Sequence, residues 1–386
     1  MATLLLIVIY IAFLGRGMPD SITGVAWSMM SLEFGVPEEY VSFITVTISL
    51  STALVSLICA RLISKFGTFR ISLFAVLALS ATLFGYYVAP SFLTLCLLAV
   101  PLGAAAGLVD NALNDYMTTH YSAVHLNVMH GVYGIGAALS PLLFSVALDQ
   151  DGAWRKGYLL CFFAMLGISA IVLLSAPLWK NKAAKDEAVI ERIDYPLTAQ
   201  LKNVRVLLTL ACVFLANAIE ALFVAYGGTY LVSAAHTGEV QASKIIMAFC
   251  LGMGFGRMIS GFLSIKFRCK TMLMVYSVAL LLPAVILIFN LPLFMLYAVF
   301  CLIGAMSGPV YPLLIYLAPE LFGKERSHAV LGTQIAVAYS GFVVSQLLMS
   351  FIVSLLSINV FPILCLVFSA MLFAFVFMLR KSADKN

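Results

Sequence analysis

The segments PLGAAAGLVDNALNDY (101–116) and LIGAMSGPVYPLLIYL (302–317) are two copies of one pattern, 201 residues apart. The identities that they share are Gly103 with Gly304, Gly107 with Gly308 and Val109 with Val310. A nearly constant offset also relates ARLISKFGTFR (60–70) to GFLSIKFRCKT (261–271), and it brings Asp20 to within one residue of Glu220. The sequence is therefore predicted to form two homologous halves.

The composition of the chain is that of a membrane protein. Of its 386 residues, 63% are hydrophobic and only 10% are charged, and the mean hydropathy is +1.08. About a quarter of the residues of an average soluble chain are charged. Apolar stretches of 18 or more residues, each long enough to cross a bilayer, recur throughout the sequence. We therefore predict an all-α polytopic membrane protein.

Twelve membrane-spanning helices are expected. Their ranges are 3–31, 39–60, 70–89, 92–118, 125–148, 157–179, 204–234, 242–264, 271–290, 292–318, 327–355 and 358–379. The polar stretch 180–203 divides them into an N-terminal bundle (1–179) and a C-terminal bundle with a short basic tail (204–386). Because six spans separate the two copies, both copies have the same orientation. Parallel six-helix repeats are typical of secondary transporters.

The basic residues predict the orientation. Seventeen of the 22 Lys and Arg residues fall in the even-numbered connections, including the central loop, in the first two residues of the spans that follow them, or in the C-terminal tail. By the positive-inside rule, both termini and the 180–203 linker are expected in the cytoplasm. The net charge of +5 is thus a topology signal, and no nucleic-acid partner is expected. The N-terminus lacks a basic region and a cleavage site, so the first segment is expected to remain as a span. The eight cysteines are scattered singly, and we predict no metal site and no redox pair.

Two segments, one in a loop and one in a span, resemble those of the major facilitator superfamily. The stretch ARLISKFGTFR (60–70) is similar to its loop between spans 2 and 3, usually G-x-L-x-D-R-x-G-R-R. Gly67 is kept, whereas Ala60 and Ser64 replace the first glycine and the aspartate. GFGRMISG (254–261) resembles the glycine-arginine segment of span 8. The resemblance implies the major facilitator fold, with structural or gating roles for Lys65 and Gly67.

Within this superfamily, four segments resemble the fucose–galactose–glucose:proton symporter family, with its sodium-dependent glucose transporter and fungal relatives. They are PDSITG (19–24), GLVDNALN (107–114), LNVMHGVYGIGAALSPLL (126–143) and NAIEALFVAYGGTYL (217–231). The pattern L-x-x-x-H-x-x-Y-G-x-G-x-x-x-x-P is carried by Leu126, His130, Tyr133, Gly134, Gly136 and Pro141. The resemblance implies a transporter but does not give the substrate, because members of this branch transport different compounds.

Ionisable residues at membrane depth each need a partner or a function. Asp110 and Asn114 are one helical turn apart and share a face. We expect His130 of span 5 at a similar depth, and a carboxylate beside an imidazole is suited to proton uptake and release. The alternative is a structural hydrogen bond between spans 4 and 5, with Asn127 contributing.

Span 7 carries a second acidic candidate. Glu220 lies about midway along it and shares a face with Asn217. Such a group can accept hydrogen bonds from sugar hydroxyls, carry a proton or help to hold sodium. Alternatively, Glu220 pairs with Arg257, which follows the small residues GMGFG (252–256) and is interpreted first as a structural clamp.

Span 1 is interrupted by the stretch GRGMPDSITG (15–24). Arg16 and Asp20 are one helical turn apart and are expected to face each other. Pro19 among glycines predicts a helix that is bent or broken at membrane depth. Two hypotheses follow. The pair either fills a structural kink, or Asp20 forms one side of a site whose other side is Glu220.

The remaining candidates are polar or aromatic side chains of several spans. For ion coupling they are Asp20, Asp110, His130 and Glu220; for substrate binding they are Arg16, Trp27, Asn111, Asn114, Tyr133, Asn217, Glu220, Tyr226, Tyr311, Gln334 and Tyr339. Neutral hydrogen-bonding groups with aromatic faces suit a neutral polyhydroxylated ligand. Pro309 is expected to bend span 10 and to act as a hinge, and Arg257, Gly67 and Lys65 complete the structural or gating set.

The predicted function is secondary active symport of a neutral sugar or similar polar solute, coupled to protons or sodium, by alternating access. The sequence has no nucleotide-phosphate loop, so an ATP-driven pump is not expected, and neither is an enzyme or a cofactor other than the coupling ion. The alternative is a proton-antiport exporter of drugs or amphipathic lipids. We expect a monomer in the lipid bilayer of a cell membrane, the bacterial inner membrane, with a small-molecule substrate as its partner.

Overall fold

The computed structural model describes residues 2–37, 40–145, 153–179, 195–237 and 239–383, and all regular structure within them is helical. In these ranges, eleven helices are long and apolar enough to cross a membrane. The prediction of an all-helical, multi-pass protein is confirmed. The expected span at 125–148 corresponds to α5 (Ala123–Ser145), and its last three residues lie outside the described part of the chain.

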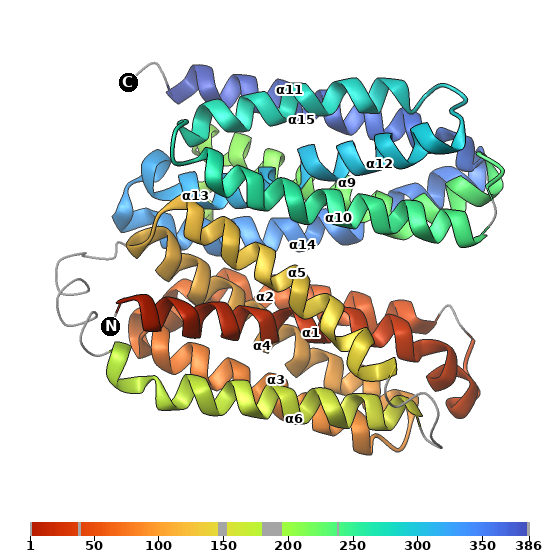
Figure 1. Cartoon of the computed structure of the whole chain (residues 1–386). Helices are drawn as coiled ribbons and strands as arrows, with labels where there is room; N and C mark the ends of the chain where they lie inside the picture. The colour runs from red at the N-terminus through yellow and green to blue at the C-terminus, as the bar shows by residue number, and fades with distance from the viewer. Residues whose placement is uncertain (1, 38–39, 146–152, 180–194, 238, 384–386) are drawn as a thin grey trace. The chain divides into compact units, whose positions relative to one another are not determined.

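The chain divides into two compact units (Figure 1). The first comprises Met1–Thr119 and Met129–Ile193, and the second comprises His120–Val128 and Asp194–Asn386. The helices of the N-terminal unit are α1 (Ala2–Phe34), α2 (Val41–Phe66), α3 (Thr68–Val88), α4 (Phe92–His120), α5 and α6 (Ala153–Leu174). The first residues of α5, up to Val128, belong to the C-terminal unit.

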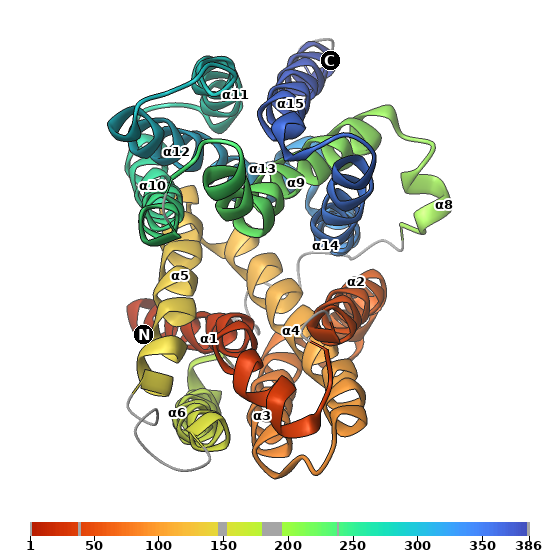
Figure 2. The same cartoon turned by 90° about the vertical axis from the view of Figure 1, so that its right-hand side faces the viewer.

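The C-terminal unit is built around its first long helix. Its elements are α8 (Leu197–Gln200), α9 (Val204–Ser233), α10 (Glu239–Leu263), α11 (Cys269–Ile286), α12 (Leu293–Ser307), α13 (Val310–Phe322), α14 (Lys324–Leu355), η2 (Ile358–Val360) and α15 (Phe361–Ala383). Helix α9 packs against α10, α13, α14 and α15, and Figure 2 shows these helices nearly end-on. Phe223 of α9 stacks on Phe249 of α10 and meets Phe361 of α15 edge-on, so the core is centred on α9.

The repeat found in the sequence recurs in the packing of the helices. A methyl group added to Gly103 of α4 would collide with the backbone carbonyl of Ile48 in α2. A methyl group added to Gly304 of α12 would collide with the backbone carbonyl of Phe249 in α10. Each glycine and each carbonyl is related to its counterpart by the offset of 201 residues. The two halves therefore contain the same close helix crossing, which only a residue without a side chain permits.

Proline has different effects in the two spans where a break was expected. In the tenth span, Gly308 and Pro309 separate α12 from α13, so the predicted irregularity is confirmed. In the first span, α1 continues from Ala2 to Phe34 with Pro19 inside it. The predicted interruption is therefore not found in α1, and the alternative, a bend at Pro19, stays a prediction. A proline removes only one hydrogen bond of the ladder, and the packing of α1 against α3 and α6 holds the remaining turns together.

A polar cluster joins α1, α3 and α6 at the C-terminal end of α1. Arg155 donates to Glu33 at 2.6 Å and to the carbonyls of Tyr87 and Ala89 at the end of α3, both at 2.9 Å. The indole of Trp154 donates to the other oxygen of Glu33. Burial raises the pKa of Glu33, but the hydrogen bonds from Arg155 and Trp154 and the positive charge of Arg155 lower it, so the pKa lies below its usual value.

The glycine crossings give a test of the repeat. Gly103→Ala and Gly304→Ala should each destabilise the protein by about 1–3 kcal/mol, because the added methyl group overpacks a backbone contact. Thermal unfolding in detergent measures the effect. Gly254→Ala of α10 is the matched control, since no atom lies within 4 Å of its added methyl group. Equal stability of all three variants and the wild type would contradict the close crossing.

The Glu33 cluster predicts a loss of stability in acid. A lowered folded-state pKa means that the cluster stabilises the fold above the unfolded pKa of about 4.5, and that this contribution disappears as the pH falls through the folded value. The melting temperature of the wild type should therefore exceed that of Glu33→Gln at pH 6, and the difference should shrink by pH 3. A difference in melting temperature that stayed the same at pH 3 would contradict this contribution of the Glu33 carboxylate.

Candidate functional site

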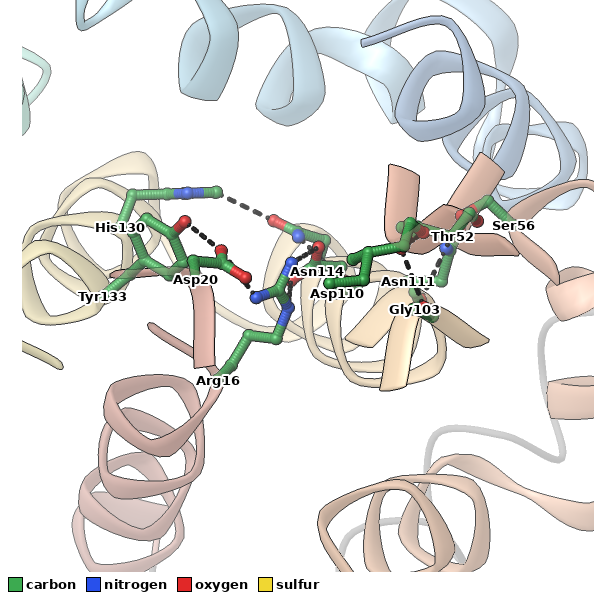
Figure 3. A network of polar contacts seen from close by, with 12 residues as sticks. Arg16, Asp20, Thr52, Ser56, Gly103, Asp110, Asn111, Asn114, His130 and Tyr133 are labelled. Atoms are coloured by element: carbon green, nitrogen blue, oxygen red, sulfur yellow. Dashed lines mark hydrogen bonds and ion pairs between the residues drawn. The ribbon is translucent and has the colours of Figure 1, made fainter. Parts of the chain in front are cut away.

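Arg16 is the centre of a buried polar network in the N-terminal unit (Figure 3). The residue is 1% exposed. Its Nη1 atom contacts Oδ2 of Asp20, one turn further along α1, at 2.8 Å. Its other side faces Asp110 of α4, with Nε 3.1 Å from Oδ1 and Nη2 3.2 Å from Oδ2. The predicted Arg16–Asp20 pair is confirmed, and a second carboxylate from another helix joins it.

Tyr133 connects this network to α5. Its hydroxyl donates to Oδ2 of Asp20, so the same carboxylate oxygen accepts from Arg16 and from Tyr133. The guanidinium carbon of Arg16 lies 5.8 Å from the centre of the Tyr133 ring, within the range of a cation–π contact. Asp20 is thereby held by groups from α1 and α5, while Asp110 is held by Arg16.

Asn114 links the network to His130. Its amide nitrogen donates to the backbone carbonyl of Asp110 at 2.8 Å, and its Oδ1 lies 3.0 Å from Nε2 of His130. Because a carbonyl only accepts, the amide nitrogen must point to Asp110 and the amide oxygen to the imidazole, so Nε2 of His130 donates. The rings of His130 and Phe13 pack nearly perpendicular to each other, with their centroids 5.2 Å apart.

The structure thus differs from the expected direct pairing of Asp110 with His130. Asp110 pairs with Arg16, and His130 pairs with Asn114. The direction of the spans predicts the depth of a residue in the membrane, but it does not determine which side of a helix meets which neighbour. Spans 4 and 5 are linked through Asn114 and His130, as the alternative hypothesis of a structural hydrogen bond proposed.

The charges of the network do not balance. Within the described residues, one guanidinium faces two carboxylates, and both Arg16 and Asp110 are buried. The side chain of Asp20 is 29% exposed, compared with 10% for Asp110. With both carboxylates ionised and His130 neutral, these groups together carry one excess negative charge.

Asn111 is turned toward α2. Its amide donates to Oγ of Ser56 and to the carbonyl of Gly107, both at 2.8 Å. Beside it, Thr52 donates to the carbonyl of Gly103 at 2.8 Å (Figure 3). These contacts fasten α2 to α4 behind Asp110. Thr52 and Ser56 were not among the predicted site residues; the signal was two hydroxyl residues four apart in an apolar span, which share one helix face.

The C-terminal unit contains the predicted ion pair. Nη2 of Arg257 on α10 contacts Oε2 of Glu220 on α9 at 3.2 Å, and its Nε donates to the carbonyl of Gly308 at 3.0 Å. Here one cation faces one carboxylate. Asn217, one turn before Glu220, donates to the carbonyl of Val213 in its own helix at 2.9 Å.

Two further candidates of the C-terminal unit contact backbone carbonyls. Tyr226 of α9 donates to the carbonyl of Gln346 in α14 at 3.1 Å. Gln334 of α14 lies with its amide nitrogen 3.5 Å from the carbonyl of Leu314 in α13. Both side chains therefore contribute to the packing of α14 against its neighbours.

The last candidates are distributed over both units. Trp27 of α1 is buried beside Phe92. Tyr311 is the second residue of α13, and Tyr339 is half-buried on α14. Gly67, with a φ of 80°, makes the tight turn between α2 and α3 that follows the exposed Lys65. The roles expected for these residues stay predictions.

Comparison with known proteins identifies the family. The sequence matches the Major Facilitator Superfamily over residues 5–289 and again over 210–386. The chain belongs to this superfamily. The predictions of a multi-pass membrane transporter and of a protein that is not an enzyme are thereby confirmed.

Solved structures of this superfamily share the fold. A variant of FucP, the fucose:proton symporter of E. coli, superimposes with a TM-score of 0.74 at 14% identity, covering 98% of each chain. Another structure of FucP, in its outward conformation, gives 0.76 at 14% identity, covering 97% of this chain and 98% of that one. The proton:xylose symporter XylE gives 0.78 at 10% identity, covering 98% and 95%.

A curated relative comes from a eukaryote. "Bypass of stop codon protein 6" of Saccharomyces cerevisiae is 25% identical over 323 residues, which are 73% of this chain. The match covers 63% of the length of the yeast protein. The expected location in a bacterial inner membrane stays a prediction, because relatives occur outside bacteria.

The network makes Arg16 essential for stability. Arg16→Met leaves the buried Asp110 and the partly exposed Asp20 without their shared cation and should cost about 3–5 kcal/mol, the usual cost of breaking a buried pair. Unfolding by heat or urea in detergent measures this loss. Arg16→Met combined with Asp110→Leu removes one charge of each sign and should recover part of the stability. If the double variant were as unstable as the single one, the loss would not come from the unpaired charge.

Proposed function

We propose that this protein is a secondary active transporter that couples the uptake of a neutral sugar-like solute to a cation, specifically a proton. The observation that supports this most is the buried Arg16 network, which has two carboxylates and one guanidinium. The transport unit in this proposal is the monomer, and it works by alternating access.

The excess charge explains why transport would need a cation. An uncompensated charge at membrane depth costs several kcal/mol. One proton on the network restores neutrality, because Arg16 then balances the remaining carboxylate. A neutral network can change its surroundings during alternating access at a lower cost than a charged one. Protonation would therefore favour reorientation of the loaded transporter.

The geometry favours Asp20 as the group that takes the proton. Asp110 faces Arg16 through both of its oxygens, whereas Arg16 contacts only Oδ2 of Asp20. Asp20 is also the more exposed carboxylate, so a proton reaches it more easily. Since Oδ2 already accepts from Arg16 and Tyr133, the site suits a proton, which needs one lone pair, better than a hard metal cation, which needs several oxygen ligands.

The neighbouring groups support a hydroxylated substrate. Tyr133 and Asn114 are neutral hydrogen-bonding groups beside the proton site, and the rings of Tyr133 and Phe13 provide apolar faces. Among the described residues Arg257 engages Oε2 of Glu220, so Oε1 is placed to accept from a sugar hydroxyl. Fucose and xylose, named for FucP and XylE, define the class of compound to test first.

One observation favours the alternative, export of amphipathic compounds by proton antiport. An apolar cleft of about 350 Å³ lies between α9, α14 and α15. Its walls include Phe214, Leu348, Phe368 and Phe375, together with the polar Ser345. A cleft of this kind accepts apolar compounds more readily than sugars.

The direction of proton movement distinguishes the two functions. In proteoliposomes, a panel of neutral pentoses and hexoses should make the external medium alkaline if sugar and proton enter together. An amphipathic compound that is added outside and enters in exchange for a proton makes the external medium acidic instead. A sodium gradient without a pH gradient tests the choice of cation. Absence of flux for every sugar and every gradient would overturn the proposal.

Asp20→Asn tests the coupling site. The variant should exchange sugar across the membrane at equal concentrations, but it should lose accumulation driven by a pH gradient, because Arg16 and Asp110 are already neutral together. Glu220→Gln is the comparison in the other unit, and it should weaken sugar binding while any remaining transport keeps its pH dependence. Asp20→Asn with intact accumulation would assign the proton to another group.

A further inference from the structure

Two prolines interrupt the hydrogen bonding between α12 and α13. Gly308 and Pro309 have helical backbone angles, with φ and ψ of −53° and −44° in the first and −69° and −20° in the second. The chain therefore follows a helical path from α12 into α13. Pro309 and Pro312 have no N–H to donate along this path. In a regular helix the carbonyl of Gly308 accepts from the amide four residues later, so it loses this partner at Pro312.

A side chain of α10 takes the place of the missing donor. Nε of Arg257 donates to the carbonyl of Gly308 at 3.0 Å, and this contact is buried. Nη2 of the same guanidinium donates to Oε2 of Glu220 on α9 at 3.2 Å. One arginine thus connects the proline-containing joint between α12 and α13 to the carboxylate that the proposed function assigns to the solute.

The guanidinium of Arg257 is divided between these two partners. In an arginine, Nε and Nη2 form a fork that matches both oxygens of a carboxylate. Arg16 uses this fork on Asp110, with Nε 3.1 Å from Oδ1 and Nη2 3.2 Å from Oδ2. In Arg257 the Gly308 carbonyl takes Nε, so only Nη2 reaches Glu220. Within the described residues, Oε1 of Glu220 has no hydrogen bond or ion pair, and the side chain is 23% exposed.

We propose that Pro312 controls solute affinity by keeping Oε1 of Glu220 open. The missing N–H at Pro312 leaves the Gly308 carbonyl to Arg257, and this carbonyl holds one arm of the guanidinium fork away from the carboxylate. Pro312 and Arg257 are therefore positioning residues, and Oε1 is the atom that accepts from a solute hydroxyl. The inference rests on the proposed function for the solute, but not for the geometry of the carboxylate.

Pro312→Ala tests this geometry. Because the backbone at Gly308 and Pro309 is already helical, the new N–H should donate to the Gly308 carbonyl. Nε of Arg257 can then turn to Oε1 of Glu220. Affinity for the neutral pentose or hexose that the wild type transports best should fall about tenfold, because one hydrogen bond to a charged group is lost.

A second variant at this position acts through the same carbonyl. Asn111 is the counterpart of Pro312 in the repeat, and its side chain donates to the carbonyl of Gly107, the counterpart of Gly308. Pro312→Asn therefore offers the Gly308 carbonyl a side-chain donor as well as a backbone N–H. It should weaken solute binding in the same direction as Pro312→Ala, even if one of the two variants folds poorly.

A second measurement needs no solute. A hydrophobic carbodiimide modifies a carboxyl group at an oxygen that can carry a proton, which Oε1 of Glu220 can do while Arg257 leaves it open. Mass spectrometry of the peptide that contains Glu220 gives the rate of labelling, with Glu220→Gln as the blank. Labelling should be about tenfold slower in Pro312→Ala than in the wild type, matching the hydrogen bond that Arg257 gains at Oε1.

Two controls isolate the effect. Pro283→Ala removes another buried proline inside a helix of the same unit, and it should keep the wild-type affinity and labelling rate. Lysine keeps the positive charge of Arg257 but has no fork. Adding Pro312→Ala to Arg257→Lys should therefore change neither the affinity nor the labelling rate further.

Each outcome has a defined meaning. Wild-type affinity and labelling in Pro312→Ala would overturn the inference and leave Arg257 a structural clamp. Equal losses in Pro283→Ala would overturn it in favour of a general packing effect, and an undiminished loss in the Arg257→Lys background would show that arginine does not transmit it. Slower labelling in Pro312→Ala, with no sugar bound by the wild type, would support the inference and overturn the proposed solute.

Discussion

A bilayer provides no water to solvate a charge, so each buried ionic group must find its partner within the protein. In the N-terminal unit, Arg16 satisfies this requirement for two carboxylates at once. It pairs with Asp20 on α1 and with Asp110 on α4, and Tyr133 of α5 completes the shell of Asp20. The packing of the other helices of this unit keeps these groups in contact. The hydrogen bonds of Asn111 and Thr52 hold α2 against α4 behind Asp110.

Close packing gives such a network a defined geometry. The glycine crossings bring α2 against α4 and α10 against α12 at backbone distance, and so they limit how far each helix can shift or rotate. Dispersion contacts and interhelical hydrogen bonds, which are short-ranged, replace the hydrophobic effect as the force between helices in lipid. Gly103 and Gly304 therefore help to position the polar groups on their helices.

Local rules predicted the fold well and the site in part. The apolar runs, the repeat and the pairs Arg16–Asp20 and Arg257–Glu220 followed from spacing and from the cost of an unpaired charge. The contact between Arg16 and Asp110 did not, because it depends on the rotation of α4 about its own axis, which periodicity in a uniformly apolar helix does not reveal. The same lack of information led to the expected direct pairing of Asp110 with His130. Pro19 shows the opposite error: its local preference for a break is overridden by the packing of α1.

The two halves keep one geometry but differ in charge. In the repeat, Arg257 of α10 is the counterpart of Ser56 of α2. Arg257 donates to the carbonyl of Gly308. Ser56 accepts from Asn111, which also donates to the carbonyl of Gly107, the counterpart of Gly308. In the C-terminal unit this places one guanidinium against one carboxylate, which is neutral without help. In the N-terminal unit the guanidinium comes from α1 instead and meets two carboxylates. If both halves carried the same net charge, neither would attract a coupling cation more strongly than the other. In the proposed function, the N-terminal network therefore takes the coupling proton, and the polar groups of the C-terminal half are left for the solute.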